Sequence, residues 1–175
     1  LALALTRANN LQEATKQVEW LRKNTARHPY VETLAARVLV AQRNSEQAGK
    51  LYAQALNQFP NHRALIYGLA EHYLALRQPE QVINLVREKQ AAFPDDPYFY
   101  ELLAQAYSSQ NKKMLMHQAQ GEAYYRRYNL QRALEQMDLA AKSGDGDFYQ
   151  QSIVEARLNQ LRQMVMEPKK EGIFN

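Results

Sequence analysis

Three short stretches decide the fold: RANNLQEA at 7–14, AQRNSEQA at 41–48 and ALRQPEQV at 75–82. In each stretch a small or apolar residue follows a polar break by four positions. The breaks, at Asn10, Asn44 and Gln78, recur at a constant interval of about 34 residues. Two further breaks, in SQNKKML and RRYNLQRA, centre on Asn111 and Asn129. A fixed period of this kind indicates that the chain repeats one structural unit.

Between the breaks, apolar residues recur every three or four positions, which is the spacing of one helix face. The segment from Leu65 shows this clearly, with Leu69, Tyr73 and Leu76 on the same face. The composition agrees, because the 175 residues include only 6 Gly and 6 Pro, and the abundant Ala and Leu favour helix. The sequence therefore predicts an all-α protein built from stacked helix pairs.

A repeated helix–turn–helix unit of this length, with small residues at fixed positions, resembles the tetratricopeptide repeat. That family has small, large or aromatic, alanine and proline residues at six set positions of each unit. In the unit that follows His28, those positions hold Ala36, Leu39, Ala48, Tyr52, Ala55 and Pro60. The next unit departs from the pattern at Val82 and Lys89.

The pattern then advances by half a unit. Ala104 and Tyr107 match a first helix, but the helix after them does not match a second one. Gly121 and Tyr124 match a first helix again, only half a period later. One helix, at about residues 112–128, is therefore expected to be the second helix of one unit and the first helix of the next.

The resemblance implies a right-handed α-solenoid of antiparallel helix pairs, with about four to five units and the first one truncated. It is expected to be one domain over residues 1–166, with helix pairs at about 1–27, 30–58, 61–92, 97–128 and 130–166. Residues 167–175 are expected to form a disordered tail. The chain starts with Leu1 in what reads as the middle of a helix, which indicates a piece of a longer protein.

The last helix is predicted to cap the stack. In the stretch SGDGDFYQQ, Gly144 suits the left-handed residue at a helix end, and Asp147 suits the N-cap of the next helix. That helix is expected to turn one apolar face toward its neighbours. The residues expected on this face are Phe148, Ile153, Leu158, Leu161 and Val165.

Motifs for catalysis or metal binding are not recognisable. The chain has no cysteine, which excludes a thiol nucleophile or a zinc ribbon, and no two of its 4 histidines have the spacing of a helical zinc site. His28 and His62 are interpreted as surface or cap residues, and His72 as a helix residue without catalytic work. This fragment is therefore not expected to be an enzyme or to hold a cofactor or metal.

Two charged groups also receive structural interpretations. Asp145 and Asp147 are assigned to a turn and a cap, because a calcium loop needs more oxygen ligands than this stretch offers. Arg126 and Arg127 are assigned to a solvated face or to a helix dipole. The net charge of +4 is spread along the chain rather than gathered in a stripe, so nucleic acid is not expected as a partner.

In tetratricopeptide repeats the first helices line a concave groove that binds protein partners. Carried over by register, the groove residues are Tyr30, Arg37, Tyr67, Glu71, Tyr98, Glu101 and Gln105. Tyrosine suits such a surface, because its ring provides contact area at low entropic cost. The alternative is that these tyrosines pack against neighbouring repeats.

One known mode of binding is not expected. Some tetratricopeptide domains clamp the C-terminal carboxylate of a chaperone with Lys, Asn and Arg at set positions of the first helices. In this chain those positions hold Thr33, Tyr67 and Glu101. A peptide bound through its terminal carboxylate is therefore an unfavoured ligand.

The stretch AQGEAYYRRYNLQRALEQMDLAAKSGDGDFYQQSIVEARLNQLR at 119–162 carries a narrower resemblance. It is similar to the C-terminal end of periplasmic zinc metalloproteases that enhance β-barrel assembly and carry an HExxH domain ahead of their repeats. The resemblance implies a docking domain of a periplasmic zinc metalloprotease or chaperone in outer-membrane protein assembly and quality control. Its partners would be the assembly machinery or substrate barrels, and the parent protein would hold zinc.

Two other interpretations stay open. The chain could be a free-standing cytoplasmic adaptor that binds a helical or extended peptide. It could also be a half-repeat RNA binder, which the small net charge disfavours. A membrane span is not expected, because no apolar run approaches the ~20 residues that one needs.

Overall fold

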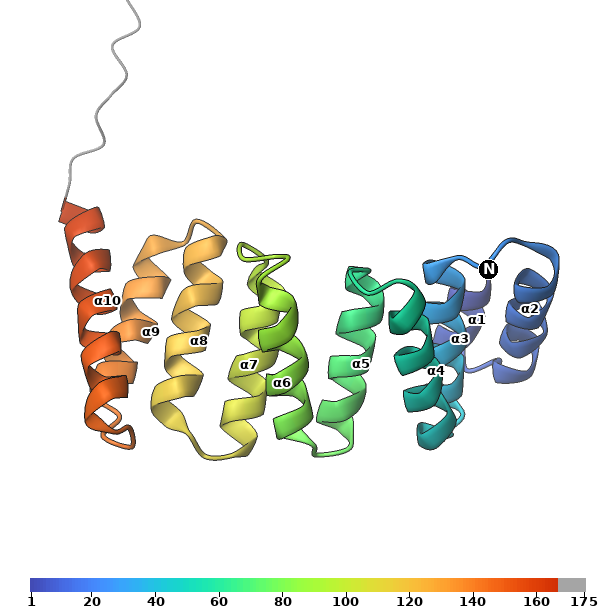
Figure 1. Cartoon of the computed structure of the whole chain (residues 1–175), viewed down its shortest axis with the longest axis horizontal. Coiled ribbons are helices and arrows are strands. Elements are labelled where there is room, and N and C mark those ends of the chain that lie inside the picture. The colour runs from blue at the N-terminus through green and yellow to red at the C-terminus, as the bar shows by residue number, and fades with distance from the viewer. Residues whose placement is uncertain (167–175) are drawn as a thin grey trace, which may run out of the picture. The chain divides into compact units, whose positions relative to one another are not determined.

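The structure is a computed structural model that describes residues 1–166, which form ten helices and no strand (Figure 1). The all-α prediction is confirmed for this part of the chain. None of its helices is long and apolar enough to cross a membrane. The expected tail, 167–175, lies outside the described residues. The helices are α1 (Ala2–Arg7), α2 (Leu11–Asn24), α3 (Pro29–Ala41), α4 (Ser45–Gln58), α5 (Arg63–Ala75), α6 (Pro79–Gln90), α7 (Pro97–Ser109), α8 (Lys113–Arg126), α9 (Leu130–Ala141) and α10 (Phe148–Met166).

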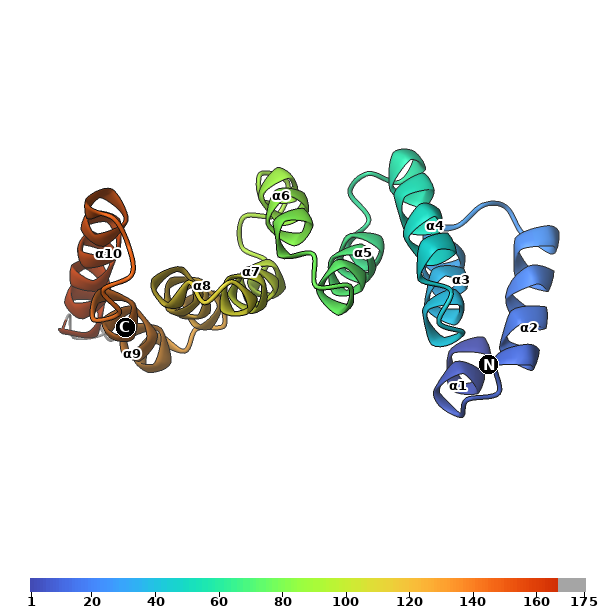
Figure 2. The ribbon, with the colours of Figure 1, turned by 90° about the horizontal axis from the view of Figure 1, so that it is seen from below.

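The helices group into two compact units. Unit 1 covers residues 1–92 and holds α1 to α6, and unit 2 begins at Phe93 and holds α7 to α10. In unit 1, α3 packs against α2, α4 and α5, and α5 packs against α6 (Figure 2). In unit 2, each helix packs against the one that follows it. The grouping of all helices into one domain over 1–166 stays a prediction.

Five turns of one type carry the repeat. Each holds a non-glycine residue with φ between 56° and 62°, and these residues are Asn9, Arg43, Arg77, Asn111 and Tyr128. In the turn after α5, the Arg77 N–H donates to the Leu74 carbonyl at 3.0 Å, and the Gln78 N–H donates to the Tyr73 carbonyl at 2.9 Å. This pair of bonds defines a Schellman turn, and the other four turns have equivalent bonds.

The spacing of the five turns confirms the period and its half-step. The first four left-handed residues lie one full period apart, and Tyr128 follows Asn111 after only half a period. Helix α8 lies between these last two turns and packs against both α7 and α9. It is therefore the helix that two successive units share, as the sequence predicted.

Small residues allow the helices of unit 1 to approach closely. Ala14, Ala48 and Ala36 are completely buried, as the repeat pattern requires. Tyr52 of α4 is buried against α5, where a Cβ on Gly68 would lie 2.5 Å from the tyrosine ring. Only glycine at this position leaves room for the ring, so Gly68 fixes the distance between α4 and α5.

Asp145, in the loop between α9 and α10, caps the N-terminus of α8. Its two carboxylate oxygens accept hydrogen bonds from the N–H groups of Lys113, at 2.6 Å, and Met114, at 2.9 Å. Lys112, the N-cap residue of α8, makes no side-chain cap bond of its own. Within residues 1–166 no cluster of three or more His, Cys, Asp or Glu could hold a metal ion. The cap therefore gives Asp145 a structural role.

Helix α10 begins with a reciprocal cap. The Gln150 N–H donates to the Asp147 carboxylate at 2.8 Å, and the Asp147 N–H donates to the Gln150 amide oxygen at 3.2 Å. This capping box confirms Asp147 as the N-cap. Gly144 has the expected positive φ, 70°, and lies two residues after Lys142, the C-cap of α9.

The buried face of α10 differs from the predicted one. Leu158 and Leu161 are buried as expected, but the third buried residue is Val154, and Phe148 is 89% exposed. Ile153 and Val165 are also exposed. The prediction was wrong for these three residues. Phe148 and Ile153 lie off the face formed by Val154, Leu158 and Leu161, whereas Val165 continues that face in the last turn of α10 and is exposed there.

Candidate partner-binding surfaces

The seven predicted groove residues fall into the two units. Four lie on α3 and α5 of unit 1, and three lie on α7 of unit 2. The structure brings two of the four together around one pocket and two of the three around another. The prediction of a binding role stays a prediction for all of them.

The pocket of unit 1 lies between α3, α4 and α5 and has a volume of about 120 Å³. Arg37 of α3 and Glu71 of α5, both predicted groove residues, line it from opposite helices. These two side chains are exposed and stand at equivalent positions of consecutive units, one full period apart. The remaining walls are mostly small or apolar, apart from Tyr52 and His72.

Tyr52 and His72 provide buried polar groups in the walls of this pocket. Burial raises the pKa of the Tyr52 hydroxyl to about 12, against the opposing effect of Arg37, which hydrogen-bonds to it. His72 is only 5% exposed, and its ring centroid lies 6.3 Å from that of Tyr52. His72 is therefore an interior helix residue, and its non-catalytic interpretation stays a prediction.

Tyr30 lies at the start of α3 and is 64% exposed. Its ring meets the ring of His62 edge-on at 4.6 Å, and its N–H donates to the Nδ1 of His28 at 3.3 Å. The bond from Tyr30 confirms His28 as an N-cap residue. Burial and, secondly, the nearby His28 lower the pKa of the His62 imidazole. The two histidines hold an exposed tyrosine ring in a defined place.

Tyr67 and Tyr98, the other two predicted tyrosines, are half-buried. Tyr98 follows the N-cap Asp96, whose carboxylate accepts the Tyr98 N–H at 3.0 Å. The binding interpretation and the packing interpretation of these two tyrosines both stay predictions.

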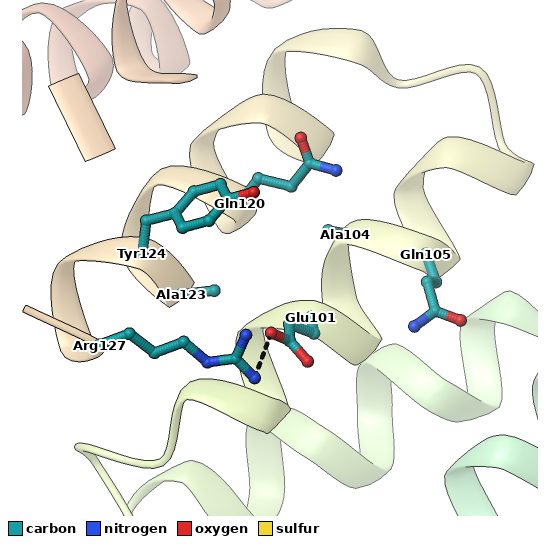
Figure 3. Close-up of a pocket in the computed structure, with 7 residues that line it drawn as sticks. All are labelled: Glu101, Ala104, Gln105, Gln120, Ala123, Tyr124 and Arg127. Atoms are coloured by element: carbon teal, nitrogen blue, oxygen red, sulfur yellow. Dashed lines mark ion pairs between the residues drawn. The ribbon is translucent and has the colours of Figure 1, made fainter. Parts of the chain in front are cut away.

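One of the pockets in unit 2, called the pocket of unit 2 from here on, lies between α7 and α8 and has a volume of about 230 Å³ (Figure 3). Glu101 and Gln105, both predicted groove residues, contribute the α7 side with Ala104. The α8 side is formed by Gln120, Ala123, Tyr124 and Arg127. Arg127 and Glu101 form an ion pair at 2.6 Å across the pocket, so its two charges neutralise each other.

Arg126 holds the end of α8 against the start of α7. Its guanidinium donates to the Pro94 carbonyl at 2.8 Å, stacks over the Tyr100 ring at 3.9 Å and pairs with Glu122. Glu122 also accepts two hydrogen bonds from Arg157 of α10. The assignment to a solvated face or to a helix dipole was wrong for Arg126, whose half-buried side chain makes specific pairs. Arg127 is exposed, as predicted, and also pairs with Glu101.

The α8 residues of this pocket were not predicted. Gln120 stands where Tyr52 and Val86 stand in the two preceding units, and both of those side chains are fully buried. A glutamine at a packing position leaves space and turns it polar. The sequence did carry a signal for these residues, because this helix does not match the repeat pattern. At Gln120 the mismatch replaces a packing residue by a residue that lines the pocket.

Comparisons with known proteins agree with this architecture. A family model described as tetratricopeptide repeat matches residues 39–106, which is less than half of the chain. No curated protein matches. Together with the solved structures below, the family model supports a tetratricopeptide repeat domain.

Several solved structures have the same fold. MamA 41-end from Desulfovibrio magneticus RS-1 is 17% identical, with a TM-score of 0.61 over 95% of this chain and 93% of that one. A MamA RS-1 double mutant is 15% identical, with a TM-score of 0.62 over the same shares. TTC0263, a thermophilic TPR protein from Thermus thermophilus, is 15% identical, with a TM-score of 0.58 over 93% and 96%. At these identities the likeness concerns the fold, and it supports an α-solenoid.

Proposed function

We propose that this chain binds protein segments through pockets on the first-helix faces of its two units. The observation that carries the proposal is the pocket of unit 2, where Glu101 and Gln105 meet Tyr124 and Arg127 of the next helix. Tetratricopeptide domains in general bind proteins and do not catalyse reactions, which supports a binding role for this fragment.

The pocket chemistry suits a polypeptide. The paired charges of Glu101 and Arg127 leave the pocket without a net charge. The amides of Gln105 and Gln120 can each donate and accept hydrogen bonds, as a peptide backbone does. A pocket of about 230 Å³ is smaller than the roughly 300–1,000 Å³ of small-molecule sites, so it suits one side chain of a larger partner.

The test is a double variant that changes one predicted residue in each unit. Tyr67→Ala with Glu101→Lys is expected to keep the helical circular dichroism of the wild type, because neither residue is buried. It is expected to reduce cross-linking to protein partners in the source cells. The matched control is Lys50→Glu, an exposed charge change on the second helix α4. Unchanged cross-linking in the double variant would place binding on another face.

We further propose that the parent protein is a periplasmic zinc metalloprotease and that this chain is its docking arm. In this role it would bring the protease to the outer-membrane β-barrel assembly machinery or to substrate barrels. The support is the resemblance of residues 119–162 to such proteases, including the half-step at α8 and the stretch that begins α10. Zinc would belong to the parent's HExxH domain.

The parent sequence ahead of Leu1 tests this second proposal. An HExxH motif preceded by a signal peptide, together with periplasmic fractionation of the parent, is the expected result. Further repeats without a zinc motif would contradict it and favour the cytoplasmic adaptor. That outcome would leave the proposal of a protein-binding domain untouched.

A further inference from the structure

Helix α5 lies across the helix pair of α3 and α4 in unit 1. It packs against both of these helices (Figure 2). Tyr52 of α4 is only 1% exposed, and a Cβ on Gly68 of α5 would lie 2.5 Å from its ring. His72, one turn further along the same face of α5, has its ring centre 6.3 Å from that of Tyr52. The face of α5 that holds Gly68 and His72 therefore covers the tyrosine of the preceding helix pair.

Unit 2 has the same kind of helix pair in α7 and α8, but this pair is left uncovered. Helix α9 packs against α8, and α10 packs against α9. Among the described residues of unit 2, none from α9 or α10 lines the pocket between α7 and α8 (Figure 3). The half-step accounts for this difference. Helix α9 packs on α8 as a second helix packs on a first one, instead of lying across α7 and α8 as α5 lies across α3 and α4.

The pocket of unit 2 corresponds to a buried surface of unit 1. Four of the residues that line it lie two full periods after buried residues of α3 and α4: Ala104 after Ala36, Gln120 after Tyr52, Ala123 after Ala55 and Tyr124 after Leu56. The two alanines are kept, so the helices of each pair approach closely in both units. Tyr52 and Leu56 are buried, whereas Gln120 and Tyr124 are partly exposed. The pocket is therefore the uncovered counterpart of the surface that α5 covers.

The difference between Tyr52 and Gln120 determines what fits into this pocket. In unit 1 the tyrosine ring fills the space, so only glycine fits opposite it on α5. In unit 2 the glutamine is shorter, and about 230 Å³ stays open. A helix in the place of α5 has room there for a large side chain at the position of Gly68. That side chain would meet the apolar ring of Tyr124.

The polar residues of the pocket suit a helix from another protein. Glu101 and Arg127 pair at 2.6 Å, and Gln105 is exposed, so the empty pocket is compatible with water. Interfaces that form and dissociate combine a polar rim with an apolar centre. Ala104 and Tyr124 supply apolar contacts in this pocket. The surface can therefore remain open in the free protein and still bind a helix.

We propose that the pocket of unit 2 binds one amphipathic α-helix of a partner protein, in the place that α5 takes on α3 and α4. The contact face of this helix carries a large apolar side chain where α5 carries Gly68, with further contacts one turn before and after it. On α5 those two places hold Leu65 and His72. The inference rests on the proposed function, because it names the partner of the same pocket. It goes further by specifying a helix and the side chain that enters the pocket.

The probe is a fluorescein-labelled peptide with the sequence of residues 62–77, which includes α5, and with the change Gly68→Leu. Binding to the whole chain is measured by fluorescence anisotropy. The matched peptide carries Gly68→Ala, which favours helix equally but has no side chain that fills the pocket. The wild-type protein is expected to bind the Gly68→Leu peptide at least about tenfold more tightly, because leucine buries three more carbon atoms.

A third peptide tests the helical conformation. It carries Tyr67→Pro in addition to Gly68→Leu, because proline inside a helix breaks it. Tyr67 does not line the pocket of unit 1, so this change leaves the contact face of the peptide intact. The proline peptide is expected to bind at least about tenfold more weakly than the Gly68→Leu peptide.

A protein variant locates the binding in the pocket. Gln120→Tyr restores the ring that fills the corresponding space in unit 1, so it is expected to weaken binding of the Gly68→Leu peptide at least about tenfold. Gln118→Tyr is the matched control, because Gln118 is a half-buried residue of the same helix that does not line the pocket. It is expected to leave the affinity unchanged, and circular dichroism confirms that both variants fold. Unchanged affinity in Gln120→Tyr would overturn the inference.

The remaining outcomes separate this inference from the proposed function. Equal binding of the proline peptide would overturn the helix and leave the pocket as a site for an extended segment. If the wild type binds none of the peptides, but Tyr67→Ala with Glu101→Lys in the protein still reduces cross-linking to partners, only the helix inference fails. If that cross-linking is also unchanged, the proposed function fails with it.

Discussion

Backbone conformation at single residues has a measurable cost in this chain. Arg43 and Arg77 have φ values of 62° and 56°, in the left-handed region that disfavours a side chain. Glycine adopts this conformation freely, which is why it is the usual residue at the end of a helix.

Replacement of Arg77 by glycine is therefore expected to stabilise the protein. Arg77→Gly should raise the free energy of unfolding by about 0.5–1 kcal/mol, since relief of strain exceeds the added freedom of the unfolded chain. Urea denaturation followed by circular dichroism measures it. Gln54→Gly, at an exposed position within α4, is the control and should lower the same quantity by about 1 kcal/mol. A loss of stability in Arg77→Gly would show that the backbone at Arg77 is not strained.

Tyr52 makes the stability of the chain dependent on alkaline pH. Its pKa rises from 10.0 to about 12 on folding, mainly through burial. The raised pKa means that the neutral phenol stabilises the folded state below pH 10, and that this contribution disappears as the pH rises through about 12. The contribution is on the order of 3 kcal/mol.

The measurement is the free energy of unfolding of the wild type and of Tyr52→Phe across this pH range. The wild type should lose more stability than the variant between about pH 10 and pH 12, because phenylalanine has no proton to release. Comparison of the two proteins cancels the titration of the other tyrosines and lysines. Parallel curves would show that the Tyr52 hydroxyl is accessible to water.

At the scale of helices, the start of α8 depends on a side chain from a distant loop. Asp145→Ala removes both hydrogen bonds to the N–H groups of Lys113 and Met114. The expected loss in the free energy of unfolding is about 1–2 kcal/mol, as for other helix N-caps. Asp145→Asn retains one acceptor and should lose less. Equal stability of the wild type and the alanine variant would mean that solvent caps α8 as well.

The packing of α4 against its neighbours leaves no space for a larger side chain at Ala48. Ala48 is completely buried at the first small-residue position of that helix. Ala48→Leu should lower the free energy of unfolding by about 1–3 kcal/mol through overpacking. The control is Ala53→Leu, an exposed position of the same helix that should change stability little. Thermal unfolding of the two variants decides whether the helix register is right.

Helices and turns were the most predictable part of this protein. Asn10, Asn129 and Asp147 cap helices by local hydrogen bonds, so neighbours in sequence determine where those helices begin. The outer face of α10 was less predictable, because an apolar residue such as Phe148 has no local signal for which side its helix buries. Only the α7 residues of the unit 2 pocket, Glu101 and Gln105, were predicted from the sequence. Its α7 side follows the repeat register, whereas Gln120 breaks it.

At the scale of the whole molecule, unit 2 contains every residue that lines the pocket between α7 and α8, and it has its own core. Met114, Met137 and Leu161, from three different helices, are buried together. Residues 93–175 expressed alone are therefore expected to fold, with helical circular dichroism and a cooperative thermal transition. A fragment without a cooperative transition would show that unit 2 needs unit 1 to fold.

The spacing of the Schellman turns has a consequence for how such a chain can be lengthened or spliced. Up to Asn111, a deletion or insertion that keeps the alternation of first and second helices must remove or add one full period of residues. Between Asn111 and Tyr128 the same turn recurs after half a period, so a single helix with its turn can be deleted or inserted as one unit. Grafts and deletions in this segment can therefore change the number of helices from even to odd and still join at matching ends.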